Sequence, residues 1–289
     1  MGERKMRAMV VDPAAPNRLA QREVDAPQPK ASEAVVQVRA ISLNLGEVRG
    51  VARAQEGSRP GWDLAGVVVT PASDGSGPHA GDRVAGFAGS GAWAEQVAVP
   101  TNALAVLPAE VSFAQAATLP MAGLAALYAV EKGGSLLGRH VLVTGASGGV
   151  GHFAVQLAKI GGAHVTALIH DPDKGDLPRE AGADEVVVGD DATPAREHGP
   201  FALVVDAVGG ATLGTALTLL APGGVAVNFA ATDTAPVTFD ARQLFSIGGA
   251  SLYGMAIFDE VKRQPAAMGL ARLATVSYTH LRAHETGRN

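Results

Sequence analysis

Three glycines in one short segment are spaced as a phosphate-binding turn requires. The segment consists of Gly145, Ala146, Ser147, Gly148, Gly149, Val150 and Gly151. Glycine at every third position lets the backbone turn tightly and approach a pyrophosphate, whose charge is stabilised by N–H groups at the positive end of the following helix. We therefore expect these seven residues to bind a dinucleotide. The alternative is a glycine-rich turn that only packs a helix on a strand.

Residues further along the chain bear on which dinucleotide this is. In NAD-preferring sites an acidic residue about 20 residues beyond the glycines binds the ribose 2′-hydroxyl. Ile169 occupies that place, followed by His170 and Lys174. We expect the two basic residues to meet a 2′-phosphate, which favours NADPH and leaves NADH as the alternative cofactor. Asp171 could instead turn toward the ribose, and His170 and Lys174 could be ordinary solvated surface.

The elements predicted around the turn alternate as in a parallel, doubly wound sheet. Residues 141–143 read as a buried strand before the turn, and residues 153–160 as a helix with an apolar face after it. Further strands are predicted at 164–169, 185–188, 202–205, 225–229 and 251–253. This alternation predicts an α/β fold with a Rossmann dinucleotide-binding domain, which we place at residues 123–262.

The first third of the chain has a different pattern. Short β-rich segments are separated by Gly, Pro and Ser clusters, and they lie at residues 34–40, 65–69, 81–86 and 94–100. Ser112 is a candidate helix N-cap, after which the apolar spacing becomes helical. We expect a compact, mostly β domain over residues 1–122, and 289 residues are enough for two domains.

The composition argues against several classes of function. Lys and Arg number 23 against 28 Asp and Glu, a net charge of −5 without long like-charge blocks, which disfavours nucleic acid and anionic membranes as partners. The absence of cysteine excludes disulfides, cysteine-based zinc sites, iron–sulfur clusters and thiol nucleophiles. The longest apolar run, residues 117–130, is too short to span a membrane. We expect a soluble, cytoplasmic protein.

Several further motifs occur in a fixed order along the chain. They are residues 42–47 (SLNLGE), 60–68 (PGWDLAGVV), 81–84 (GDRV), 91–95 (GAWAE), 119–124 (LPMAGL), 206–210 (DAVGG) and 220–224 (LAPGG). Together with the glycine turn, this ordered set resembles the medium-chain dehydrogenase/reductase superfamily, and specifically its zinc-independent, quinone oxidoreductase-like branch. The resemblance implies a GroES-like, mostly β catalytic domain followed by the Rossmann domain.

A competing resemblance is to the short-chain dehydrogenases. The glycine turn is similar to theirs, and Tyr128 with Lys132 mimics their Tyr-x-x-x-Lys pair. In that family the pair lies far downstream of the turn, whereas here it precedes it. We therefore interpret Tyr128 as a packing residue of a helix.

The resemblance also bears on metal chemistry. Zinc-dependent relatives hold a catalytic metal with cysteine and a Gly-His-Glu segment; Asn44 aligns with that cysteine, and residues 61–63 replace that segment. His280 and His284 have i, i+4 spacing without a third partner, so we expect no metal site. The resemblance then implies zinc-free hydride transfer from NADPH to a small-molecule quinone or α,β-unsaturated carbonyl.

The resemblance assigns roles to single residues. Asn44 would lie near the nicotinamide or the substrate oxygen, and Glu47 would position that segment; the alternatives are an Asn making local backbone bonds and a solvated carboxylate. Val208 joins the residues expected to bind the cofactor. Ala125 and Gly189 replace a Thr and a Tyr that contact the cofactor in relatives. A nucleotide-binding protein without turnover, as a sensor, a structural module or an inactive homologue, is therefore the alternative function.

The end of the chain departs from the family. In relatives the sequence continues beyond this point and returns to complete the first domain. Residues 275–289 fit no element of the family and resemble a spurious translated join, with a divergent native tail as the alternative. We expect residues 263–289 to be a truncated return segment whose tail is non-native from about residue 275. Homodimerisation is expected by family analogy alone.

Overall fold

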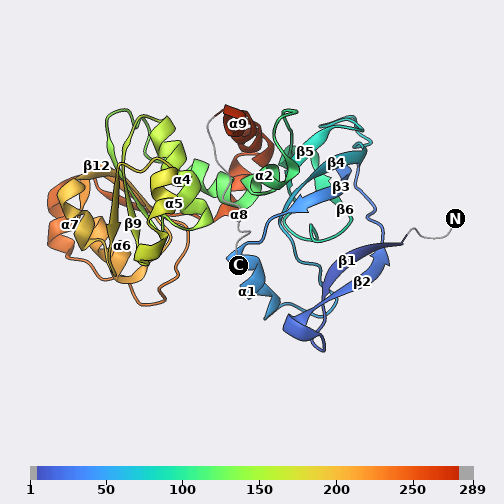
Figure 1. Cartoon of the computed structure of the whole chain (residues 1–289), viewed down its shortest axis with the longest axis horizontal. Helices are drawn as coiled ribbons and strands as arrows, with labels where there is room; N and C mark the ends of the chain where they lie inside the picture. The colour runs from blue at the N-terminus through green and yellow to red at the C-terminus, as the bar shows by residue number, and fades with distance from the viewer. Residues whose placement is uncertain (1–4, 280–289) are drawn as a thin grey trace. The chain divides into compact units, whose positions relative to one another are not determined.

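The computed structural model describes residues 5–279 and divides into two compact units (Figure 1). Unit 1 combines Met1–Leu124 with Val261–Asn289, and unit 2 is Ala125–Glu260. The second unit is therefore inserted in the sequence of the first. Within residues 5–279, no helix combines the length and the apolar character that crossing a membrane requires.

Unit 1 is built mainly from antiparallel strands. A five-stranded sheet has the order β6-β3-β4-β5-β7, and its strands are β3 (Glu33–Ile41), β4 (Asp63–Thr70), β5 (Arg83–Phe87), β6 (Gln96–Pro100) and β7 (Leu104–Val106). A separate hairpin pairs β1 (Lys5–Val11) with β2 (Leu19–Asp25). The sheet core contains Val36, Leu64 and Val84, which have no exposed surface. The prediction of a mostly β first unit is confirmed.

Short helical elements complete unit 1. They are η1 (Pro16–Arg18), α1 (Leu45–Val51), η2 (Thr101–Ala103), α2 (Phe113–Ala117), the π-helical turn η3 (Leu119–Gly123) and α9 (Ala266–Thr279). Ser112 is the N-cap of α2 and accepts a hydrogen bond from the Gln115 N–H at 3.2 Å, as predicted. Helix α9 packs against β5, β7, η2 and η3.

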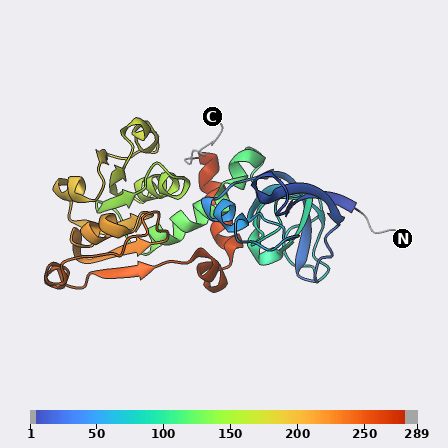
Figure 2. The same cartoon turned by 90° about the horizontal axis from the view of Figure 1, so that it is seen from below.

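Unit 2 contains a six-stranded parallel sheet of order β10-β9-β8-β11-β12-β13. The strands are β8 (His140–Thr144), β9 (His164–Ile169), β10 (Glu185–Val188), β11 (Phe201–Asp206), β12 (Leu220–Asn228) and β13 (Ser251–Gly254). Numbered from β8 as the first strand, this is the 3-2-1-4-5-6 order of the Rossmann fold, so the predicted doubly wound sheet is confirmed. Figure 2 shows β13, in orange, along one edge of the sheet.

The helices of unit 2 precede the first strand or connect successive strands. They are α3 (Leu124–Glu131), α4 (Gly149–Ile160), η4 (Pro172–Lys174), α5 (Asp176–Glu180), η5 (Thr193–His198), α6 (Gly210–Leu217) and α7 (Ala241–Ile247), and α8 (Ile257–Arg263) crosses the boundary between the two units. Tyr128 in α3 is 2% exposed, which confirms it as a packing residue. Helix α4 begins four residues earlier than predicted, inside the glycine turn.

The C-terminal residues are described only in part. Residues 275–279, expected to begin a non-native tail, continue α9 without a break. Residues 280–289, with the predicted His280 and His284 spacing, lie outside the described residues.

Candidate functional site

The glycine turn joins β8 to α4 at the carboxyl end of the parallel sheet. Gly145 has a φ of +61°, which L side chains rarely adopt, and the Gly148 N–H donates to the Gly145 carbonyl at 2.9 Å. The Ala146 N–H donates to the Leu168 carbonyl at 3.2 Å and so ties the turn to β9. The sequence therefore folds here as the predicted strand–turn–helix.

The glycines at 148 and 151 meet different surroundings. A Cβ at Gly151 would lie 2.5 Å from the Gly145 carbonyl oxygen and 2.7 Å from the Ala146 Cα, so only glycine packs there without a shift. A Cβ at Gly148 would meet only the Gly145 oxygen, at 3.3 Å. Gly148 caps α4 without a side-chain hydrogen bond, and the first N–H groups of a helix have no intrahelical acceptor. This end of α4 can receive an anion, and the turn fits the pyrophosphate of a dinucleotide.

A cleft of about 490 Å³ opens beside this turn, at the carboxyl ends of β8, β9 and β10, and we call it the strand-end cleft. Open parallel sheets bind ligands at this place in the fold. The lining residues are Gly145, Ser147, Leu168, Ile169, His170, Asp171, Lys174, Gly189, Asp190, Val208, Thr212, Thr232 and Asp233. Five of the residues predicted to bind the cofactor are thus brought together: Gly145, Ser147, His170, Lys174 and Val208. Ala146, Gly148, Gly149, Val150 and Gly151 belong to the turn but are not among the lining residues.

The cleft carries charges of both signs. The His170 Nδ1 lies 2.9 Å from the Asp190 Oδ1, and the Lys174 Nζ lies 3.6 Å from the Asp171 Oδ2. Asp171 also caps η4, because its Oδ1 accepts from the Asp173 N–H at 3.0 Å. Asp190 was not predicted, because it follows a strand whose place beside β9 only the fold reveals.

Gly189 is confined by the chain that follows it. An added Cβ would lie 2.8 Å from the Pro194 Cγ and 3.0 Å from the Asp191 carbonyl oxygen. A tyrosine here, the residue that the family resemblance implies for many relatives, would therefore require this loop to move. Ala125, the other departure, is buried in α3.

The buried carboxylate of Asp206 holds the loop that contains Val208. Asp206, at the end of β11, has no exposed surface and accepts hydrogen bonds from the Thr144 hydroxyl at 2.6 Å, the Asn228 amide at 2.7 Å and the Gly209 N–H at 3.0 Å. These bonds connect the ends of three neighbouring strands, β8, β11 and β12. They fix the loop that carries Val208.

In unit 1, Asn44 bridges two carboxyl groups at the N-terminus of α1. Its Nδ2 donates to the Glu47 Oε2 and to the Asp63 Oδ2, both at 2.8 Å. Glu47 also accepts from the Asn44 N–H at 2.7 Å and from the Trp62 N–H at 2.5 Å. We call these three side chains, Asn44, Glu47 and Asp63, the amide-bridged cluster. Glu47 is 4% exposed, so the solvated alternative is wrong. The Asn44 side chain bonds to two carboxyl groups and also forms a capping box with the Glu47 backbone, so its local-backbone alternative holds in part.

Burial dominates the electrostatics of this cluster. Burial raises the pKa of Asp63 well above its usual range, and the charge of Glu47 adds to this, while the Asn44 bond and the Met121 backbone oppose it. Burial also raises the pKa of Glu47, against the hydrogen bonds from Asn44 and Trp62. The Asp63 Oδ1 is buried and has no hydrogen bond of normal geometry within residues 5–279. Sequence reasoning missed Asp63 as a site residue, although the PGWD motif contains it.

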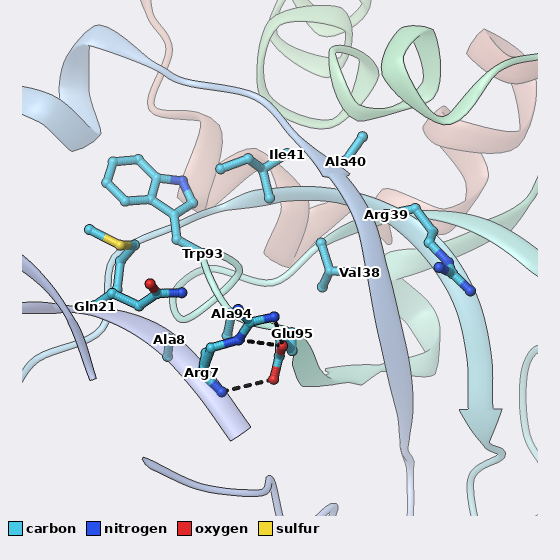
Figure 3. Close-up of a pocket in the computed structure, with 11 residues that line it drawn as sticks. Arg7, Ala8, Gln21, Val38, Arg39, Ala40, Ile41, Trp93, Ala94 and Glu95 are labelled. Carbon is cyan, nitrogen blue, oxygen red and sulfur yellow. Dashed lines mark hydrogen bonds and ion pairs between the residues drawn. The ribbon is translucent and has the colours of Figure 1, made fainter. Parts of the chain in front are cut away.

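Two pockets in unit 1 are lined by tryptophan residues. Trp62 lines a pocket of about 210 Å³ beside Glu47. Trp93 lines a shallow pocket of about 370 Å³ between the β1–β2 hairpin and β3 (Figure 3). Phe87 is instead buried in the core, and Phe258 is 38% exposed on α8.

Two charged residues that line the pocket of Figure 3 pair with each other. The Arg7 guanidinium binds the Glu95 Oε1 at 2.6 and 2.8 Å, and the Arg7 N–H binds the Glu95 Oε2 at 2.9 Å. Figure 3 shows the nitrogen edge of the Trp93 indole turned toward Ile41, and this nitrogen is buried without a partner in the described part of the chain. We assign no chemistry to this pocket.

Across the described residues, no group of three or more His, Asp or Glu side chains is arranged to hold a metal ion.

Comparison with known proteins identifies both units. Residues 30–109 match the family described as "Alcohol dehydrogenase GroES-like domain", and residues 149–272 match "Zinc-binding dehydrogenase". Together the two segments cover more than half of the chain. The first match confirms that the β-rich unit is GroES-like.

Individual relatives agree with these matches. A chloroplastic quinone-oxidoreductase homolog of Spinacia oleracea is 38% identical over 181 residues, covering 57% of this chain and 55% of that protein. A mitochondrial NAD(P)H oxidoreductase of Bos taurus is 37% identical over 173 residues, covering 55% and 43%. The structure of a mycobacterial quinone oxidoreductase superposes with a TM-score of 0.85 at 26% identity, covering 94% of this chain and 88% of that one. The match to the spinach protein spans about half of that protein's length.

Proposed function

Because the chain belongs to the medium-chain dehydrogenase/reductase superfamily, in its quinone oxidoreductase-like branch, we propose that it is an NAD(P)H-dependent oxidoreductase. The observation that carries this proposal is the glycine turn beside the strand-end cleft, at the carboxyl edge of a parallel sheet. In finer detail, we propose NADPH as the cofactor and a quinone or an α,β-unsaturated carbonyl as the substrate.

The residues of unit 2 have separate roles in this proposal. The N–H groups of the turn bind the pyrophosphate, and Val208 contacts the cofactor from the loop that Asp206 fixes. Lys174 and His170 attract the 2′-phosphate, although each lies beside an aspartate. The bound cofactor supplies a hydride to the substrate.

The amide-bridged cluster is the proposed catalytic part of unit 1. Both amide hydrogens of Asn44 are engaged by Glu47 and Asp63, and its carbonyl oxygen takes part in the capping box with the Glu47 backbone. Because an amide oxygen has two lone pairs, it can accept one further hydrogen bond. That acceptor suits a donor group of the cofactor or the substrate. Glu47 holds the N-terminus of α1 and Trp62 in place and is a positioning residue in this scheme. Solvent supplies the proton that completes the reduction.

The second candidate function is nucleotide binding without turnover. The confinement of Gly189 favours it, because the tyrosine contact of relatives is absent and the neighbouring loop leaves no room for it. Both candidate functions require the cofactor to bind. Only an oxidoreductase also oxidises the bound NADPH, so turnover distinguishes the two.

The test combines binding with turnover. Purified protein is mixed with NADPH and a panel of quinones and enones, and the absorbance of NADPH at about 340 nm is followed. In a separate experiment, the thermal stabilisation of the protein by NADPH is measured. Loss of absorbance with at least one acceptor supports the oxidoreductase. Stabilisation without any loss across the panel favours the second function, and the absence of both contradicts nucleotide binding.

Three further expectations remain proposals. We propose that residues 1–122 form the substrate domain and residues 123–262 the dinucleotide domain. The homodimer and the cytoplasmic location stay predictions, and the two relatives described above are chloroplastic and mitochondrial by name.

A further inference from the structure

A histidine and an aspartate meet at the rim of the strand-end cleft. His170 follows β9 and Asp190 follows β10, and these strands are paired so that Ile169 lies opposite Val188. The register brings the His170 Nδ1 to 2.9 Å from the Asp190 Oδ1, and both residues line the cleft.

This pair contributes little to the stability of the fold. The side chains are 83% and 93% exposed, and ion pairs in that setting are worth little because water screens them. The pair can therefore open at small cost when a ligand enters. The two groups then suit different ligands: a cationic imidazole attracts a phosphate, whereas a carboxylate accepts a hydrogen bond from a ribose hydroxyl.

We propose that the His170–Asp190 pair makes the cofactor selectivity of this site depend on pH. When His170 is protonated, it neutralises Asp190 and admits the 2′-phosphate of NADPH. When His170 is neutral, the uncompensated carboxylate of Asp190 repels that phosphate and binds the 2′-hydroxyl of NADH. This inference rests on the proposed nucleotide-binding function and adds a specificity-determining residue, Asp190, to it.

Other charged side chains lie in or beside the strand-end cleft. Asp171 and Lys174 lie on the β9 side, and Asp233 lies over the start of α6, where its carboxylate excludes any side chain at Gly210. Asp191 follows Asp190, and hydrogen bonds from Thr193 are the main reason that its pKa is lowered. Among ordinary side chains, histidine is the one that changes charge between about pH 5 and about pH 8. A change in cofactor selectivity within this pH range therefore reports on His170 or on the 2′-phosphate of the cofactor, and variants separate the two.

The experiment measures binding rather than turnover. Dissociation constants of NADPH and NADH are determined by cofactor fluorescence from about pH 5.5 to about pH 8.5. The ratio of the NADH constant to the NADPH constant should fall about tenfold with rising pH, which corresponds to about 1.4 kcal/mol. The 2′-phosphate itself changes charge at about pH 6, so variants must separate its contribution from that of His170.

Three variants make that separation. His170→Gln keeps a polar side chain that does not change charge. The ratio of its NADH and NADPH dissociation constants should therefore change with pH only through the charge of the 2′-phosphate. Asp190→Asn should raise the preference for NADPH at high pH. His79→Gln is the matched control, because His79 also forms an exposed pair with an aspartate, Asp82, but in unit 1.

The outcomes separate this inference from the function on which it rests. A fall in the wild-type ratio that His170→Gln abolishes and His79→Gln retains supports the pair as the cause. An unchanged ratio, or one that changes equally in wild type and His170→Gln, overturns the inference while nucleotide binding stands. Failure of both cofactors to bind at every pH overturns the proposed function itself.

Discussion

Asn44 gives both of its amide hydrogens to carboxyl groups that are almost entirely withdrawn from water. Burying two carboxylates close together costs free energy through lost hydration and through their mutual repulsion. A proton held by the cluster relieves both costs, which is why the pKa values of Asp63 and Glu47 are raised. At the scale of single residues, the cluster therefore combines a fixed amide with carboxyl groups that hold protons more tightly than in water.

The variant Asp63→Asn tests whether the pKa of Asp63 is raised in the folded protein, through the pH dependence of stability. The pKa of Asp63 is raised in the folded protein, so its contribution to stability is complete below the unfolded value of about 3.9 and is lost as pH rises through the folded-state pKa. Asp63→Asn removes that loss. The melting temperature of the variant relative to wild type should therefore increase as the pH is raised from about 4 to about 8.

Thermal unfolding followed by circular dichroism at several pH values checks this prediction. Asp25→Asn is the control, because Asp25 lies on the exposed hairpin with 57% of its side chain accessible. A difference between Asp63→Asn and wild type that stays constant with pH would show that Asp63 titrates in the folded protein as it does in the unfolded chain.

The sequence could reveal only part of this cluster. Asn44 and Glu47 are three residues apart, so a short helix brings them together by local geometry. Asp63 joins them through a contact 19 residues along the chain, at the first residue of β4. Its motif was visible, but its partner depends on how β4 lies beside α1, which no local pattern encodes.

At the scale of elements, two glycines of the turn, Gly148 and Gly151, are needed for different physical reasons. Gly151 lies against the backbone of the turn, whereas Gly148 has an ordinary φ of −84° and open surroundings apart from one oxygen. Close packing of helix on strand and close approach of a pyrophosphate are distinct roles of such glycines. Alanine at each position should therefore affect different properties.

Gly151→Ala should lower stability, and Gly148→Ala should lower affinity. Alanine at 151 forces the turn to shift and should destabilise unit 2 by about 1–3 kcal/mol. Alanine at 148 should leave the melting temperature nearly unchanged and weaken NADPH binding about tenfold, about 1.4 kcal/mol, by obstructing the pyrophosphate. Melting curves with and without NADPH measure both effects. Equal losses of stability in the two variants would contradict the separation.

Element bounds were predictable where the pattern was local. The strands at 164–169 and 185–188 have the predicted bounds because each is an apolar run closed by polar or glycine residues. The start of α4 was missed because glycines are poor helix formers, and tertiary packing overrides that preference here. The β1–β2 hairpin was not predicted, since β2 exposes most of its residues and shows no alternation.

At the scale of the whole molecule, the chain leaves unit 1, builds unit 2 and returns to unit 1 as α9. The return buries Ala266, Leu270, Leu273 and Ala274, each at most 2% exposed. An added Cβ at Gly123 would lie 3.0 Å from the Leu273 Cδ1, so the helix sits close against η3. The family resemblance implied a return to the first domain, but the sequence pattern alone could not say which strands receive the helix.

Leu273→Ala tests how far the integrity of unit 1 depends on α9. Removing a fully buried leucine side chain should cost about 2–5 kcal/mol, because the cavity left between α9 and η3 collapses only in part. Met268→Ala on the same helix is the control, since Met268 is 67% exposed and should change stability little. Calorimetry with and without NADPH distinguishes the two units, because the cofactor raises only the transition of the unit that binds it. We expect Leu273→Ala to lower the transition that NADPH does not shift. A lowering confined to the NADPH-sensitive transition would contradict the assignment of α9 to unit 1.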